Sequence, residues 1–135
     1  MLAESQNYTA KSNIWYAPDL RSRDGAPTPH SHPWDFESRI LLGGYTEDRY
    51  VLTGGRVHPD LGVEHEQGTT NSVRRPIYHE VRELHTAPGA TVTLMVCGQG
   101  ERGKWAHLDP ATGLTTPPER DPHFAARLRA LNPHR

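Results

Sequence analysis

The chain has 135 residues, a formal net charge of −1 and a hydrophobic fraction of 34%, which together indicate one soluble globular domain. This near-neutral charge gives no electrostatic basis for binding nucleic acid or an anionic membrane. A single cysteine, Cys97, cannot form an internal disulfide, and the N-terminus lacks the basic and apolar blocks of a signal peptide. No apolar run approaches the roughly 20 residues needed to cross a bilayer. We therefore expect a cytoplasmic protein.

Many short elements are expected, because 12 glycines and 12 prolines punctuate the chain. Apolar and β-branched runs bounded by turn residues predict strands at residues 45–53, 76–84, 90–97 and 104–108, and residues 39–42 form a further short apolar run. Residues 58–75 have little apolar content and no periodicity, which indicates a long loop or a frayed hairpin. Helical spacing occurs only at residues 122–131.

This pattern predicts an all-β fold, a small antiparallel β-barrel or jelly roll with a short C-terminal helix. We expect a single domain over residues 1–135. Residues 1–24 would form an N-terminal extension or strand, residues 25–109 the barrel core, and residues 110–135 a C-terminal turn and the helix. A barrel of this size has a mouth wide enough for one small ligand.

Two histidines two residues apart are the first candidate metal ligands. In an extended chain, His30 and His32 point the same way and present two imidazoles to one point. The carboxylate of Asp35 or Glu37 lies within reach if the strand bends at Pro33. Two histidines and one carboxylate on one side of a metal leave its other positions open, which suits Fe(II) with O₂ or substrate.

A third histidine lies on a later strand. Alternation over residues 76–84 places His79 on one face together with Ile77, Val81 and Glu83. In a barrel, that face would direct His79 toward the same interior point as the other two histidines.

These residues resemble the first cupin motif, with Gly25, His30, His32, Glu37 and Gly43 in nearly its spacing. The Gly25–His30 and Glu37–Gly43 intervals are each one residue short. Pro76 followed by His79 resembles the second motif, whose later asparagine is missing and whose glycine is only loosely matched by Gly68. Roughly residues 29 to 108 look like a subgroup of small cupins with an H-x-H-P-W-D-F signature.

The resemblance implies a metal held by His30, His32 and His79, with Glu37 favoured as the fourth ligand. Asp35 would then accept a hydrogen bond from a ligand or hold the bend. If neither carboxylate binds, a three-histidine site remains, as in some iron cupins. Fe(II) is the favoured metal, with Zn, Ni or Mn as alternatives. The ligand set contains no sulfur, which argues against a structural zinc site.

Further polar residues lie outside the proposed ligand set. Glu83 and Asp35 are the candidate acids or bases at the barrel mouth. The second cluster, formed by His58, Glu64, His65 and Glu66, is interpreted as part of a solvated loop. Cys97 is expected to be a buried, inert thiol.

The function predicted from these residues is a metal-dependent cupin enzyme that acts on a small organic molecule, with Fe(II)-dependent oxygenation favoured. A non-redox metal cupin (a cyclase, isomerase or lyase) and a non-catalytic cupin that binds a small ligand are the alternatives. The expected partner is a small-molecule substrate, with no nucleic acid and no membrane. A strand rich in Val and Leu suits pairing of two copies as a homodimer.

Overall fold

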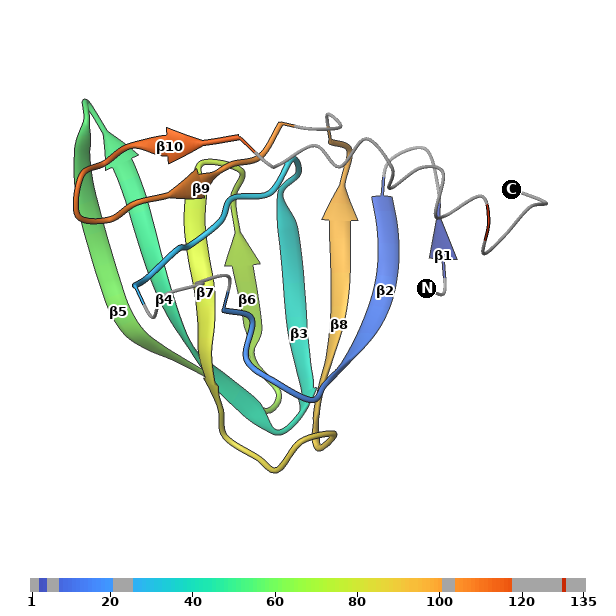
Figure 1. Cartoon of the computed structure of the whole chain (residues 1–135). Coiled ribbons are helices and arrows are strands. Elements are labelled where there is room, and N and C mark those ends of the chain that lie inside the picture. Colours follow the sequence, from blue (N-terminus) through green and yellow to red (C-terminus); the bar gives the residue numbers. More distant parts are fainter. Residues whose placement is uncertain (1–2, 5–7, 21–25, 101–103, 118–129, 131–135) are drawn as a thin grey trace.

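The computed structural model describes residues 3–4, 8–20, 26–100, 104–117 and 130. Its strands form a five-stranded sheet in the spatial order β1 (Ala3–Glu4), β2 (Tyr8–Trp15), β8 (Thr91–Gly98), β3 (Phe36–Leu42) and β6 (Thr70–Val73). A three-stranded sheet has the order β5 (Arg56–Glu66), β4 (Gly44–Thr53) and β7 (Ile77–Leu84). The short strands β9 (His107–Leu108) and β10 (Thr115–Thr116) pair with each other. The strands of the two larger sheets converge at the lower end of Figure 1 and spread apart above.

The two larger sheets pack through their inner faces. One core cluster joins Phe36, Val73 and Cys97 of the five-stranded sheet to Ile77 of β7. A second cluster joins Ile40 of β3 to Tyr45 and Val81 of the three-stranded sheet. Side chains from both inner faces thus form two apolar clusters between the sheets, as expected for packed antiparallel sheets.

The predicted all-β, antiparallel fold is confirmed, and the strands expected at 45–53, 76–84 and 90–97 correspond to β4, β7 and β8. Of the two forms predicted, a β-barrel or a jelly roll, a closed barrel is not formed, because the strands of the described residues pair as separate sheets. The helix predicted at residues 122–131 lies almost entirely outside the described residues. In the part of the chain that the structure describes, no helix is long and apolar enough to span a membrane. The predicted homodimer stays a prediction.

The long loop predicted at residues 58–75 is wrong, because most of that stretch belongs to β5 and β6. The other interpretation, a frayed hairpin within this stretch, is wrong as well, because β5 and β6 belong to different sheets. Strand β5 pairs with β4 across a turn at Gly54 and Gly55, whose φ angles of 58° and 78° suit a two-residue hairpin turn. Strand β5 is an edge strand with most side chains exposed on both faces, so its sequence carries no apolar alternation.

Strand β3 alternates cleanly between the core and solvent. Phe36, Ser38 and Ile40 are buried, whereas Glu37 and Arg39 are exposed. Ile40 is 0% exposed and belongs to the second core cluster, with Tyr45 and Val81. The next residue, Leu41, is 44% exposed.

This alternation predicts that Ile40→Ala lowers the free energy of unfolding by about 3 kcal/mol, because the truncation leaves a cavity in the core. Leu41→Ala, the matched control on the outer face, should change it by less than about 1 kcal/mol. Urea unfolding followed by circular dichroism measures both. Equal losses for the two variants would contradict the assigned faces of β3.

Candidate metal centre

The segment that carries the first two histidines lies between two strands. His30 forms antiparallel bridges with His79 of β7 on one side and with His107 of β9 on the other. Backbone bonds run from Ser31 N to the Ala106 carbonyl (2.9 Å) and from Leu108 N to the Pro29 carbonyl (2.9 Å). Prolines at positions 29 and 33 favour an extended backbone in the residues before them. The segment therefore extends the three-stranded sheet beyond β7 and joins it to β9 and β10.

Direct strand pairing brings the first and third histidines together. His30 N donates to the His79 carbonyl (3.1 Å), and His79 N donates to the His30 carbonyl (2.9 Å). Residues paired in this way point their side chains to the same face, and the two ring centroids are 4.9 Å apart. Both side chains are buried.

His32 joins the pair because it follows His30 by two residues. Its Nε2 lies 2.8 Å from Nε2 of His79, and its ring centroid is 4.9 Å from that of His30. One ligand atom from each of the three imidazoles lies within 4.8 Å of the others. The structure thus brings together the three histidines that the sequence singled out, and together they can hold a metal ion.

Behind the histidines lies a buried carboxylate, Glu47 of β4, that the sequence analysis missed. Its side chain is 0% exposed and accepts a hydrogen bond from His79 Nδ1 at 2.7 Å. It also bonds to His65 Nε2 at 3.1 Å and to the Asn71 side-chain amide at 3.1 Å. Burial without partners would be costly for this group, and these donors satisfy both oxygens.

The protonation state of Glu47 fixes the role of His79. Burial acts to raise the pKa of Glu47, but hydrogen bonds and charge interactions with His65 and His79 outweigh it and lower that pKa to about 2. An ionised carboxylate only accepts hydrogen bonds, so Nδ1 of His79 must carry the proton. When the imidazole is neutral, its lone pair is then on Nε2, the atom that faces His32. A carboxylate bound to the far nitrogen of a histidine is the arrangement that orients metal-ligating imidazoles.

Another carboxylate lies beside the first histidine. Oδ2 of Asp19 is 3.6 Å from Nε2 of His30, and the Asp19 backbone N donates to the Val81 carbonyl at 3.0 Å. This contact connects His30 to the loop that follows β2.

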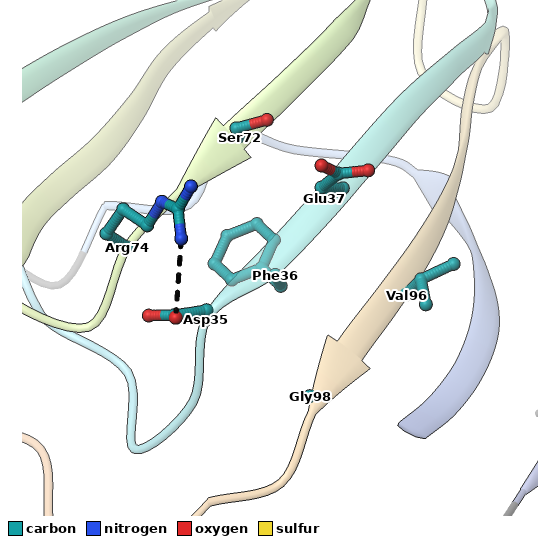
Figure 2. Close-up of a pocket in the computed structure, with 7 residues that line it drawn as sticks. All are labelled: Asp35, Phe36, Glu37, Ser72, Arg74, Val96 and Gly98. Atoms are coloured by element: carbon teal, nitrogen blue, oxygen red, sulfur yellow. Dashed lines mark ion pairs between the residues drawn. The ribbon is translucent and has the colours of Figure 1, made fainter. Parts of the chain in front are cut away.

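The structure does not bring Glu37, the carboxylate favoured as fourth ligand, to the three histidines. Phe36 points into the core and packs against His32, with ring centroids 4.8 Å apart, so Glu37 faces outward on β3. Figure 2 shows Glu37 near Ser72 and Val96, in a separate pocket of about 240 Å³. Residues 33 and 34 form a bend that interrupts the strand between His32 and β3, so alternation does not carry across it.

Asp35 holds a turn and does not reach the histidine cluster. Its Oδ1 accepts a bond from the Arg75 backbone N at 2.7 Å, and its Oδ2 lies 3.8 Å from Arg74 Nη1. Figure 2 shows this ion pair at the rim of the same pocket. These contacts hold the turn before β7, and neither role considered for Asp35, as acceptor from a ligand or as the group that holds the bend at Pro33, follows from them.

Glu83 is exposed and lies on the opposite face from His79. Thr46 pairs with Glu83 while Glu47 pairs with Val81, so Arg82 is an extra residue in β7. This β-bulge reverses the alternation beyond Val81, which turns Leu84 inward and Glu83 outward. The predicted common face for Ile77, His79 and Val81 does not extend to Glu83.

The predicted solvated cluster at residues 58–66 is wrong for one of its members. His65 is only 8% exposed and bonds to Glu47, because β5 pairs with β4 and directs this side chain inward. The sequence held one signal for Glu47. It lies two residues after Tyr45 in a predicted strand, which places it on the same face as a large aromatic side chain.

A pocket of about 480 Å³ lies at the surface beside His32. It is lined by Ser31, His32, Arg75, Pro76, Tyr78, Lys104, Trp105 and Ala106. His32 belongs both to this pocket and to the histidine cluster, so a molecule in the pocket would contact one of the three candidate ligands.

Comparisons with known proteins add little to this geometry. No family model matches the chain, and no curated protein sequence matches it. Among solved structures, the chain is similar to RmlC from Streptococcus suis in complex with dTDP-D-xylose, at 12% sequence identity and a TM-score of 0.44. The match covers 87% of this chain and 57% of that one, so this chain spans little more than half of that protein. Family and function therefore rest on the residues of this chain.

The buried carboxylate predicts a specific acid sensitivity of the metal-free protein. The pKa of Glu47 is 4.5 in the unfolded chain and about 2 in the folded protein. The ionised carboxylate therefore stabilises the folded state fully above about pH 4.5, and this stabilisation is lost as pH falls toward 2. The pKa difference corresponds to about 3 kcal/mol. Urea unfolding of chelator-treated protein across this pH range should show the loss in the wild type and a flatter profile in Glu47→Gln.

Glu37→Gln is the matched control, because it removes a carboxylate that is exposed on β3. It should keep the acid profile of the wild type. If Glu37→Gln flattened the profile as much as Glu47→Gln, the assignment of the effect to Glu47 would be wrong.

Proposed function

We propose that this protein is a metal-dependent cupin enzyme that acts on a small organic molecule, with Fe(II)-dependent oxygenation as the favoured reaction. The observation that carries the proposal is the cluster of three buried or half-buried imidazoles whose ligand atoms lie within 4.8 Å. The bond from His79 to Glu47 adds to it, because that bond orients a lone pair toward the centre of the cluster. The cupin motifs of the sequence and the antiparallel sheets agree with it.

The donor set fits a first-row divalent metal. Neutral imidazole nitrogens suit iron, zinc, nickel and copper, and two such nitrogens on one octahedral ion lie about 3 Å apart. The Nε2 atoms of His32 and His79 are 2.8 Å apart. His30, His32 and His79 would hold the metal, which corresponds to the three-histidine alternative and leaves out Glu37. Fe(II) would supply redox chemistry with O₂, whereas Zn, Ni or Mn would polarise a carbonyl or hydroxyl group.

Neighbouring residues of the chain define the surroundings of this centre. Glu47 fixes the tautomer of His79 and keeps its ring in place. Phe36 packs edge-on against His32 and closes the side toward the apolar core. A substrate would therefore approach from the pocket beside His32.

A second candidate, non-redox proton transfer in an isomerase, cyclase or lyase, is favoured by one specific contact. A buried histidine bound to a carboxylate at 2.7 Å is a suitable general base, because the carboxylate stabilises the imidazolium that forms. In this reaction Nε2 of His79 would accept a proton from the substrate. Asp35 and Glu83 are not part of either proposal, since both are exposed and neither joins the histidine cluster.

Metal analysis tests the proposal most directly. Purified without a histidine tag and reconstituted anaerobically with Fe(II), the wild type should retain about one metal ion per chain, as measured by elemental mass spectrometry. The double variant His30→Ala, His32→Ala should retain almost none, because it lacks two of the three ligands. His58→Ala, which removes an exposed histidine of β5, is the matched control and should bind like the wild type. Equal metal content in the double variant and the wild type would refute the metal centre.

Glu47→Gln should weaken metal binding about tenfold or more without abolishing it, because a glutamine makes His79 a less basic ligand. Competition with a fluorescent chelator measures this change in dissociation constant. Glu37→Gln should leave the dissociation constant unchanged. An unchanged constant in Glu47→Gln would show that His79 is not a ligand through Nε2.

A further inference from the structure

The pocket beside His32 has an unbalanced set of charges. Among the described residues that line it, the charged ones are Arg75 and Lys104, both cationic, and none carries a carboxylate. The chain as a whole has a formal net charge of −1, so this local excess of positive charge is not a consequence of composition. A concave surface lined by one sign of charge concentrates ligands of the opposite sign.

Short contacts hold the backbone on both sides of this pocket. Asp35 Oδ1 accepts a bond from the Arg75 backbone N at 2.7 Å, and the Ile77 N to Arg74 carbonyl bond (3.0 Å) closes the turn before β7. On the other side, Ala106 N donates to Ser31 Oγ at 3.0 Å, next to Trp105 and Lys104. The backbone of Arg75 is thus anchored to Asp35, and Ala106, two residues after Lys104, is anchored to Ser31 beside the histidines.

Aromatic side chains supply the apolar part of the lining. Trp105 and Tyr78 both line the pocket, and the Trp105 ring lies 6.5 Å from that of His30, edge to face. Flat apolar walls of this kind favour a planar or unsaturated molecule over a hydrated ion.

We infer that the substrate of this pocket is an organic anion with a planar apolar portion. Its carboxylate or phosphate group lies at Arg75 and Lys104, its planar portion contacts Trp105 and Tyr78, and its reactive end is directed toward His32. This inference rests on the proposed function for the reaction at the histidines, but the anion site itself needs no metal.

Three probes of similar shape test the inference: benzoate, phenyl phosphate and the uncharged benzamide. Calorimetric titration at low ionic strength should show binding of at least one anion at millimolar or lower concentration and binding of benzamide at least about tenfold weaker. A preference for benzoate assigns a carboxylate substrate, and a preference for phenyl phosphate assigns a phosphate ester. Added salt should weaken binding of the anions only.

Arg75→Gln and Lys104→Gln should each lower the affinity for the preferred anion several-fold, and the double variant by about tenfold or more, with benzamide binding unchanged. Arg39→Gln is the matched control, because Arg39 is exposed on β3 and does not line the pocket. Equal affinity for charged and uncharged probes, no binding of either anion, or full affinity in the double variant would overturn the inference.

The same titrations are repeated on the double variant His30→Ala, His32→Ala and on chelator-treated wild type. The metal content of the double variant Arg75→Gln, Lys104→Gln is also measured. Anion discrimination that persists in protein unable to bind metal supports the anion site even if the metal centre is refuted. Normal metal content with no anion discrimination refutes the anion site and leaves the metal centre in place.

Discussion

The site depends on one interaction, the 2.7 Å hydrogen bond between His79 and the buried carboxylate of Glu47. A charge at 0% exposure is tolerated only when it is paired, and Glu47 is surrounded by donors from β5, β6 and β7. The need to satisfy this carboxylate keeps His79 in one orientation and one tautomer. His79 in turn lies opposite His30 in a strand pair, so the same constraint extends to the segment that carries the other two histidines.

Local pattern was sufficient to identify the three histidines. The H-x-H spacing places His30 and His32 on one side of an extended segment, and the alternation of β7 places His79 on an inner face. For Glu47 the local pattern gives only its place on the same face as Tyr45, because its partners His65, Asn71 and His79 lie on three other strands. Cross-strand register is set by tertiary packing, which periodicity within one strand does not contain.

The structure departs from the predicted pattern where alternation is interrupted. The extra residue Arg82 turns Glu83 outward, and the bend at residues 33 and 34 uncouples Glu37 from the histidines that precede it. The strands β5 and β6 were mistaken for a loop or frayed hairpin because β5 is an edge strand with both faces largely polar. In each case either a strand is interrupted by a bulge or a bend, or a strand forms only because it pairs with a neighbouring strand. Neither condition leaves a signal in the spacing of apolar residues.

The two candidate reactions make opposite demands on Nε2 of His79. As a metal ligand this atom donates its lone pair to the ion and cannot accept a proton from a substrate, whereas as a general base it must be free of metal. Glu47 supports both roles, since a carboxylate at Nδ1 increases the basicity of the imidazole toward metal ions and protons alike. The positions of His30 and His32 distinguish between these two roles of His79. A general base gains nothing from a second and third imidazole within 4.8 Å. If these imidazoles became protonated, their charge would oppose the positive charge that His79 acquires when it accepts a proton. Three converging imidazoles are instead the donor set of a metal ion, which is why the metal-dependent reaction is the better account of this site.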